Sequence, residues 1–406
     1  MTSPGSVEMK FLVLVGDGMG DYPRADLGGK TVLEAASIPN MNWIAKYGRG
    51  GLAQTIPPRM HPGSDVANME LMGFDTTEQF TGRAVFEALS MGRTLRKNDV
   101  AFRANLVTLE NGRMKDYAAG HITTQESAEL MKMIDEALGT EAVRFYPGVS
   151  YRNLVIWSGG TDTMNTFPPH DIIGREYAPY LPNGEGAVEI LSIMERSKPL
   201  LENALVNRKR EASGKNPANS LWLWGQGKSL ELDSIEERYG LTGGVISAVD
   251  LIKGIGISAG LKSVFVPGAT GYIDTNYRGK AEAALNSLKT MDFMYVHVEA
   301  PDEAGHIGNT EIKLRAVEDF DREVVGPILK EVRNRNDLAV LVTCDHCTPL
   351  EKRTHTREPV PFAWYGPKVR RDSMEVFSEN EALSGAVKDI KGHELLNMFI
   401  GDFIAL

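Results

Sequence analysis

The chain has 406 residues, of which 42% are hydrophobic and 24% are charged, as is typical of a soluble globular protein. Its net charge of -10 gives no reason to expect nucleic acid or an anionic membrane as a partner, and no run approaches the ~18 apolar residues of a membrane span. Its two cysteines, Cys344 and Cys347, cannot form a disulfide framework and suit a reducing compartment, so we expect a cytoplasmic protein.

Short runs of Val, Leu and Ile that end in Gly, Asp or Pro recur along the chain and predict strands. In chain order these runs cover residues 11–18, 153–160, 263–268, 293–302 and 338–346. Because the runs are continuous rather than alternating, they are typical of strands buried on both faces of a parallel sheet. Helical spacing predicts helices at 124–139, 280–290 and 311–334. The alternation of the two patterns predicts an α/β fold, and the length of the chain predicts two domains.

Acidic and histidine side chains follow three of the predicted strands. These residues are Asp17, then Asp302 and His306, then Asp345 and His346, with His355 on the next loop. Because ligands bind at the carboxyl ends of parallel strands, residues so far apart in the chain can converge at one edge of the sheet. Asp and His ligate Zn, Mn and similar ions, and six of them could supply two sites of three ligands.

Each of these residues also has an ordinary structural interpretation. A single Asp after a strand is often a helix cap or a turn residue, and a lone buried His is often structural. The "CDHC" segment could be a redox or zinc pair, but the chain has no second cysteine pair to complete a four-ligand site. The occurrence of the pattern at three strand ends favours a metal centre.

Ser64 is the candidate nucleophile. It follows Pro-Gly and precedes a predicted amphipathic helix in "HPGSDVANMELMGFD" (61–75). The backbone N–H groups of a helix start favour an anion such as phosphate, and a bound metal ion can activate a serine hydroxyl. The alternative is a common N-cap serine with no chemical role.

Many ordered motifs together resemble one family. They are "GDGMGDYP", "HPGSDVANMELMGFDTTEQFTGR", "DVAFRANLVT", "YAAGHIT", "NSLWLWGQGK", "ISAVDLIKGIG", "VEAPDEAGHIGN" and "TCDHCTPLEKRTHT". From Lys10 onward, the chain is similar to the cofactor-independent phosphoglycerate mutases of the shorter, archaeal-type branch. That family belongs to the alkaline phosphatase superfamily of metalloenzymes.

The resemblance implies an α/β, alkaline-phosphatase-like parallel-sheet domain, interrupted by a smaller inserted α/β transferase domain that binds substrate. We expect the phosphatase-like domain at 1–76 and 215–406 and the insert at 77–214, since the polar stretch 207–220 has the composition of a domain edge.

The resemblance also implies two divalent metal ions, Mn, Zn, Co or Mg, and a phosphorylated small-molecule substrate. One ion would be held by Asp17, Ser64, Asp345 and His346, and the other by Asp302, His306 and His355. Ser64 would accept the phosphoryl group, so that 2-phosphoglycerate and 3-phosphoglycerate interconvert through a phosphoserine without 2,3-bisphosphoglycerate.

A substrate with a carboxylate and a phosphate requires basic side chains around it. His121 matches the family's phosphate-contacting histidine, and motif context adds five further candidates: Arg83, Arg152, His170, Lys228 and Lys253. Each of the five could instead be an ordinary solvated charge.

Three other functions remain open from the sequence. Members of this branch have been proposed as homoserine kinases, with the same metal site and a changed pocket. Nucleotide binding is the second alternative, and it rests on two weak motifs. "WGQGKS" (224–229) resembles the end of a phosphate-binding loop but has Trp222 in place of its first glycine. "KGIGISAG" (253–260) contains a lone G-x-G-x-x-A. A metal-binding module without activity is the third alternative, although a closed structural site would not need Ser64.

Overall fold

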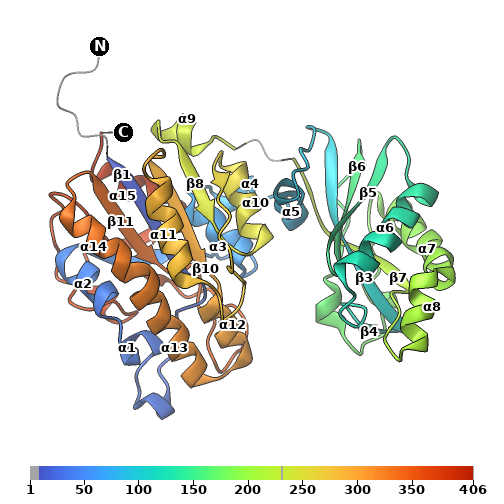
Figure 1. Ribbon diagram of the computed structural model, residues 1–406, viewed down its shortest axis with the longest axis horizontal. Helices are drawn as coiled ribbons and strands as arrows, with labels where there is room; N and C mark the ends of the chain where they lie inside the picture. Colours follow the sequence, from blue (N-terminus) through green and yellow to red (C-terminus); the bar gives the residue numbers. More distant parts are fainter. Residues whose placement is uncertain (1–8, 230–231, 406) are drawn as a thin grey trace. The chain divides into compact units, whose positions relative to one another are not determined.

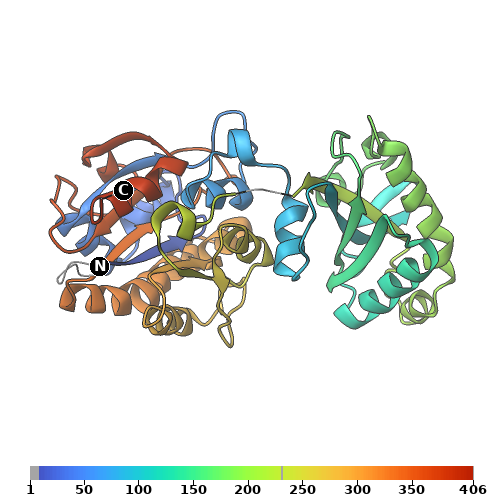
Figure 2. The same ribbon diagram turned by 90° about the horizontal axis from the view of Figure 1, so that it is seen from above.

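The computed structural model describes residues 9–229 and 232–405 and divides into two compact units (Figures 1 and 2). Unit 1 comprises Met1–Phe80 and Leu232–Leu406, and unit 2 comprises Thr81–Glu231. The predicted α/β class with a parallel sheet is confirmed. Unit 2 ends after residue 231 rather than 214, because the strand at Ser220–Lys228 pairs with the strand at Asp99–Glu110 inside it.

Unit 1 is built on one eight-stranded sheet in the order β13-β2-β12-β11-β1-β10-β8-β9. Its strands are β1 (Lys10–Gly16), β2 (Arg49–Gln54), β8 (Gly243–Ile246), β9 (Lys262–Ser263), β10 (Phe293–Val298), β11 (Leu338–Thr343), β12 (Val360–Tyr365) and β13 (Val387–Lys391). β1 lies between β10 and β11 and is parallel to both, whereas β12 is antiparallel to its neighbours. The carboxyl ends of the three central strands therefore meet at one edge, where Gly16 lies opposite Val298 and Val15 opposite Thr343.

Helices cover both faces of this sheet (Figure 1). One face packs on α1 (Val32–Ala35), α2 (Pro39–Tyr47), α11 (Tyr277–Ser287), α13 (Thr310–Phe320) and α14 (Gly326–Asn334), with a π-helical turn at Asp321–Val325. The other face carries α3 (Ser64–Leu71), α10 (Asp250–Ser258) and α15 (Gly392–Gly401). Shorter elements are α4 (Thr76–Gln79), α9 (Ile235–Tyr239), α12 (Ala300–Ile307) and the 3-10 turns Ala25–Leu27 and Glu381–Ser384. Since both faces are buried, the central strands are mostly apolar, which explains the continuous Val/Leu runs.

Unit 2 has a five-stranded antiparallel sheet. Its strands are β3 (Asp99–Glu110), β4 (Arg113–Asp116), β5 (Val143–Val149), β6 (Arg152–Ser158) and β7 (Ser220–Lys228), and β3 pairs with β4, β6 and β7. Helices α6 (Thr124–Leu138), α7 (Ala187–Asn203) and α8 (Leu205–Ala212) share the main core with one face, and α5 (Arg83–Ser90) packs on the other. Short 3-10 turns lie at Pro169–Ile172 and Ala178–Tyr180.

Several predicted elements differ from the observed ones. The run at 153–160 is strand β6 of unit 2 and pairs antiparallel, not parallel. The run at 263–268 contributes only the two-residue strand β9, and Phe265 within it is 85% exposed. The stretch 207–220 is partly helical, because α8 extends to Ala212. Within residues 9–229 and 232–405, no helix is long and apolar enough to cross a membrane.

Candidate active site

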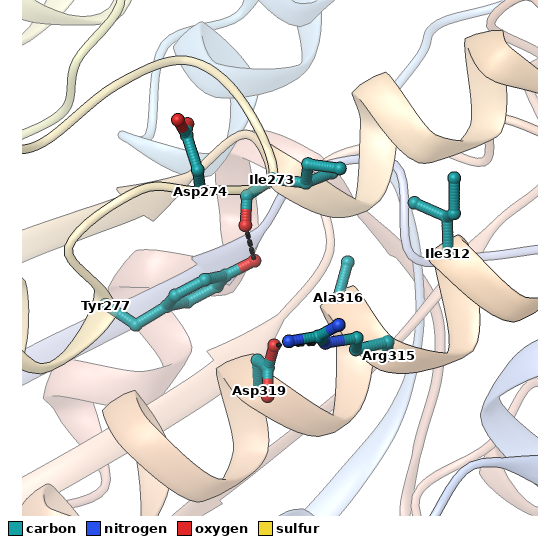
Figure 3. Close-up of a pocket in the computed structure, with 7 residues that line it drawn as sticks. All are labelled: Ile273, Asp274, Tyr277, Ile312, Arg315, Ala316 and Asp319. Atoms are coloured by element: carbon teal, nitrogen blue, oxygen red, sulfur yellow. Dashed lines mark hydrogen bonds and ion pairs between the residues drawn. The ribbon is translucent and has the colours of Figure 1, made fainter.

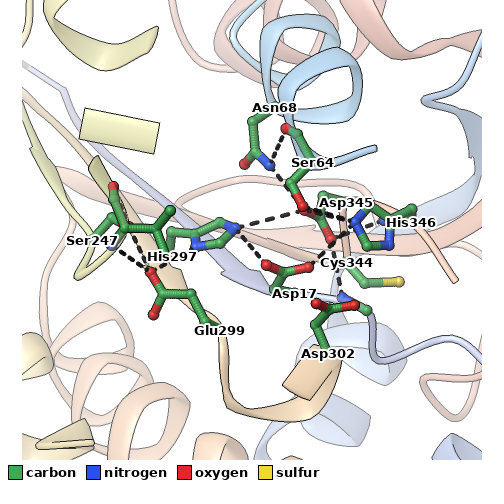
Figure 4. Close-up of polar contacts among 12 residues, drawn as sticks. Asp17, Ser64, Asn68, Ser247, His297, Glu299, Asp302, Cys344, Asp345 and His346 are labelled. Carbon is green, nitrogen blue, oxygen red and sulfur yellow. Dashed lines mark hydrogen bonds and ion pairs between the residues drawn. The ribbon is translucent and has the colours of Figure 1, made fainter. Parts of the chain in front are cut away.

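Asp17, Asp345 and His346 form the first group of candidate ligands, which we call trio A (Figure 4). Asp17 directly follows β1, and the other two lie just beyond β11. His346 Nε2 lies 3.4 Å from Asp17 Oδ1 and 3.6 Å from Asp345 Oδ2, and all three side chains are buried. Gly18 allows this approach: its φ of 61° and its contact with Asp302 leave no space for a Cβ, and its N–H donates to Asp345 Oδ1 at 3.0 Å.

Ser64 is the first residue of α3, and its hydroxyl faces trio A. Ser64 Oγ lies 3.1 Å from His346 Nε2. Asn68, one turn later, donates from Nδ2 both to the Ser64 carbonyl and to Asp345 Oδ2, each at 2.8 Å, and Tyr295 donates to its Oδ1. The helix that carries the candidate nucleophile is therefore hydrogen-bonded to a candidate ligand through Asn68, a connection that the sequence did not reveal.

Asp302, His306 and His355 form the second group, trio B. Asp302 and His306 lie one turn apart on α12, and His355 lies on the loop before β12. Asp302 Oδ2 is 3.2 Å from His306 Nε2, Asp302 Oδ1 is 3.4 Å from His355 Nε2, and the two Nε2 atoms are 3.1 Å apart. The rings of His346 and His355 are 4.2 Å apart, so the two trios adjoin.

The electrostatics of trio A favour a bound cation. Burial, followed by the charges of Asp345 and Asp302, raises the pKa of Asp17 well above its usual value. Burial also raises the pKa of Asp345, but His346, His297 and the Gly18 N–H outweigh it and lower the pKa overall. Burial lowers the pKa of His346 to about 4, so that its imidazole is neutral at pH 7. Crowded carboxylates beside a neutral imidazole are the donor set that a divalent ion requires.

The positions of the donor atoms also fit a metal ion. Asp17 Oδ1 is buried and has no hydrogen-bond partner among the described residues. His306 Nδ1 is 3.0 Å from the Arg353 carbonyl, so an N–H donated there leaves the Nε2 lone pair directed toward His355. Trio A with Ser64 could hold one ion and trio B another, each with oxygen and nitrogen ligands. Such a centre can activate a hydroxyl and stabilise a transferring phosphoryl group.

A chain of buried polar groups lies behind trio A. His297, on β10, has Nε2 at 3.4 Å from Asp17 Oδ2 and Nδ1 at 3.3 Å from Glu299 Oε1. Glu299 is paired with the fully buried Lys280 at 2.8 Å. Burial lowers the pKa of His297, but Asp345 and Glu299 outweigh it and raise the pKa to about 9. His297 is thus positioned to orient the Asp17 carboxylate, and its location inside a predicted apolar strand is the signal that could have indicated this.

Unit 2 contains a cluster of charged and aromatic side chains, the arginine cluster: Arg83, Glu87, Arg103, His170 and Trp224. Arg103 is only 6% exposed, donates to Glu87 Oε2 at 3.0 Å and stacks over Trp224 at 4.1 Å. Arg83 Nε lies 3.7 Å from Glu87 and is buried without a hydrogen bond to any described residue, and the His170 ring is 5.4 Å from Trp224. Two guanidinium groups thus share one carboxylate. Sequence reasoning found Arg83 and His170 but missed Arg103, although its position in an apolar strand was a signal.

The other predicted substrate residues have separate environments. Arg152, at the start of β6, is exposed and lies over Tyr151. His121 is exposed on the loop before α6, and Lys228 pairs with Asp162 at 3.1 Å. Lys253 belongs to unit 1, where it pairs with Asp250 on α10. Of the six candidates, the structure brings Arg83 and His170 together through the arginine cluster.

The two nucleotide-binding motifs have the wrong local structure. The "WGQGKS" segment lies largely in strand β7 rather than in a loop that precedes a helix. Gly254 and Gly256 lie inside helix α10, where Gly256 packs against Val245. Neither segment forms the loop that cradles phosphates.

Unit 1 also has a surface cavity of about 280 Å³ at α11 and α13 (Figure 3). It is lined by Ile273, Asp274, Tyr277, Ile312, Arg315, Ala316 and Asp319. Arg315 pairs with Asp319 at 3.6 Å, and the lining includes no residue of either trio. The cavity is therefore separate from the candidate metal centre.

The fold and the site define an α/β enzyme in which a serine and two Asp/His groups meet at the carboxyl edge of a parallel sheet. Residues 45–207 match the family model of 2,3-bisphosphoglycerate-independent phosphoglycerate mutase. A 2,3-bisphosphoglycerate-independent phosphoglycerate mutase of Methanosarcina acetivorans is 50% identical over 396 residues, which cover 97% of this chain and 100% of that one. The chain belongs to this family of isomerases, as its motifs predicted.

Two solved structures are similar to this chain over nearly its full length. A protein from Pyrococcus horikoshii has a TM-score of 0.84 and 30% identity, with 98% of each chain covered. The cofactor-independent phosphoglycerate mutase from Thermoplasma acidophilum has a TM-score of 0.69 and 28% identity, and covers 97% of this chain and 99% of that one.

Proposed function

We propose that the protein interconverts 2-phosphoglycerate and 3-phosphoglycerate through a phosphoserine at Ser64, with two divalent ions and without 2,3-bisphosphoglycerate. The observation that carries this proposal is the hydroxyl of Ser64 at a helix start, 3.1 Å from His346 Nε2 of trio A, which adjoins trio B. The name and the full-length similarity of the Methanosarcina relative support the reaction. The predicted ion is one of Mn, Zn, Co or Mg.

Asp17, Ser64, Asp345 and His346 would hold one ion, and Asp302, His306 and His355 the other. When bound, the two ions would lower the pKa of the serine hydroxyl and neutralise charge on the phosphate. Asn68 links the first turn of α3, which carries Ser64, to Asp345, and the N-terminus of α3 favours the negative charge that develops on the phosphoryl oxygens.

The chemistry proceeds in two displacements at phosphorus. Ser64 Oγ loses its proton and attacks phosphorus, the bond from phosphorus to the glycerate oxygen breaks, and that oxygen takes up a proton. Glycerate turns while still bound, and its other hydroxyl loses a proton and attacks the phosphoserine. The Oγ–P bond then breaks and Ser64 is reprotonated. In-line positioning and electrostatic stabilisation supply the acceleration.

The inserted unit 2 would bind the substrate's anionic groups. The arginine cluster supports this role, because Arg83 and Arg103 share the single carboxylate of Glu87 and so retain excess positive charge. Arg152, His170, His121, Lys228 and Lys253 remain predicted contacts.

A chelation assay tests the reaction. Conversion of 3-phosphoglycerate to 2-phosphoglycerate is measured without 2,3-bisphosphoglycerate, before and after EDTA, and after Mn²⁺ is restored. We expect activity that EDTA abolishes and Mn²⁺ recovers, and no activity in Ser64→Ala. Full activity of Ser64→Ala would refute the phosphoserine intermediate. ATP-dependent phosphorylation of homoserine without mutase activity would show that homoserine, not phosphoglycerate, is the substrate.

A further inference from the structure

The hydroxyl of Thr348 lies between the two trios. Thr348 is fully buried just beyond β11, and its Oγ1 hydrogen-bonds both to Asp302 Oδ1 of trio B and, at 3.2 Å, to His346 Nδ1 of trio A. A hydroxyl has one hydrogen, and an ionised carboxylate can only accept. Thr348 therefore donates to Asp302, and His346 must carry its proton on Nδ1 to donate to Thr348.

This arrangement determines how both trios present their donor atoms. With the proton on Nδ1, the lone pair of His346 is on Nε2, which faces Ser64 Oγ at 3.1 Å and Asp17 Oδ1 at 3.4 Å. The same hydroxyl orients the carboxylate of Asp302, whose two oxygens face the two histidines of trio B. One side chain thus selects a tautomer in one trio and a carboxylate orientation in the other.

Thr348 is itself held rigidly. Its carbonyl accepts from the buried Lys313 Nζ at 2.8 Å, and its N–H donates to the Gly20 carbonyl at 3.3 Å. Gly18 and Gly305 pack directly against it: a Cβ on Gly18 would lie 2.6 Å from Thr348 Oγ1, and one on Gly305 would lie 2.6 Å from its carbonyl oxygen. Neither glycine could therefore carry a side chain beside Thr348, and its backbone is fixed by hydrogen bonds on both sides.

We propose that Thr348 is a positioning residue shared by the two ion sites, so that loss of its hydroxyl weakens both sites together. This inference rests on the metal-dependent function proposed above. It assigns to Thr348 no contact with substrate or metal. Its effect passes through His346 and Asp302, which is why a single substitution should alter two sites rather than one.

Metal binding to the full-length chain provides the test. EDTA-stripped protein is titrated with Co²⁺ by calorimetry and by visible absorption, which reports ligand geometry. Thr348→Val removes the hydroxyl and keeps the shape, Thr348→Ser keeps the hydroxyl, and Thr348→Ala is a second hydroxyl-free variant in case the valine does not fold. Thr343→Val is the matched control, since Thr343 is equally buried but, among the described residues, its hydroxyl donates only to the Cys344 and Pro361 carbonyls.

We expect the hydroxyl-free variants to raise both Co²⁺ dissociation constants by roughly 10–100-fold and to change the absorption spectrum. Thr348→Ser and Thr343→Val should keep both constants within about threefold of wild type, a range well below that effect. The inference is overturned if only one constant changes, or neither, while the wild type binds two ions. A wild type that does not bind two ions would instead overturn the proposed function.

Discussion

Lys313 offers the sharpest test of how the loops that carry the candidate site are held. Its side chain is fully buried, and its ammonium group donates to the Gly20 carbonyl at 3.1 Å, Asp21 Oδ2 at 2.9 Å and the Thr348 carbonyl at 2.8 Å. All three donors are used, and they join α13 to the loop after β1 and the loop after β11. Lys313→Met keeps the length of the side chain and removes all three bonds.

The expected loss follows from the burial of the pair. Without Lys313, the Asp21 carboxylate stays buried and keeps only backbone N–H partners, from Tyr22 and Leu350. Breaking one side of a buried ion pair costs about 3–5 kcal/mol. For a unit of this size, such a loss lowers the Tm by roughly 6–20 °C. Because the penalty comes from the unpaired charge, the double variant Asp21→Asn/Lys313→Met should lose less than Lys313→Met alone.

Urea unfolding followed by far-UV circular dichroism measures the loss, and hydrogen exchange of the two loops assigns it to unit 1. Lys352→Met is the control, because Lys352 pairs with Glu351 at 3.5 Å with both side chains more than half exposed, where a pair contributes about 0–1 kcal/mol. The reasoning is wrong if Lys313→Met loses less than about 1 kcal/mol, the range of such an exposed pair, or if the double variant loses more than the single one.

Three further predictions concern packing, substrate and metal. Gly51→Ala should destabilise unit 1 by about 3 kcal/mol or more in urea unfolding, because its Cβ would overlap the Val387 carbonyl of β13. Gly271→Ala, where a Cβ meets only an ordinary contact, should be near neutral, and equal losses would refute the packing argument. Arg103→Lys should raise the KM for phosphoglycerate about 10–100-fold, because it loses the planar hydrogen-bonding fork of arginine, whereas the exposed Arg113→Lys should not. Mn²⁺ at 100 times its Kd should stabilise EDTA-stripped protein by about 2.7 kcal/mol for each site that it fills, and an unchanged Tm would contradict a metal centre.

The sequence by itself determined the α/β class and the candidate residues of the metal centre. Continuous apolar runs mark strands buried on both faces, and Asp17, Asp302 and Asp345 follow three of them. These runs became the adjacent parallel strands β1, β10 and β11, so their carboxyl ends meet. A local pattern was sufficient to predict these ligands, because a residue that directly follows a parallel strand lies at the carboxyl edge of the sheet.

Only the tertiary structure decided which side chains surround those residues. Thr348, Asn68 and Lys313 carry no local signal of their roles, because each acts through a partner from a distant part of the chain. The end of unit 2 depended likewise on β7, whose pairing with β3 links residues more than 100 positions apart. Hydrogen bonding and burial between distant segments follow from how the chain packs, and spacing along the sequence does not record that packing.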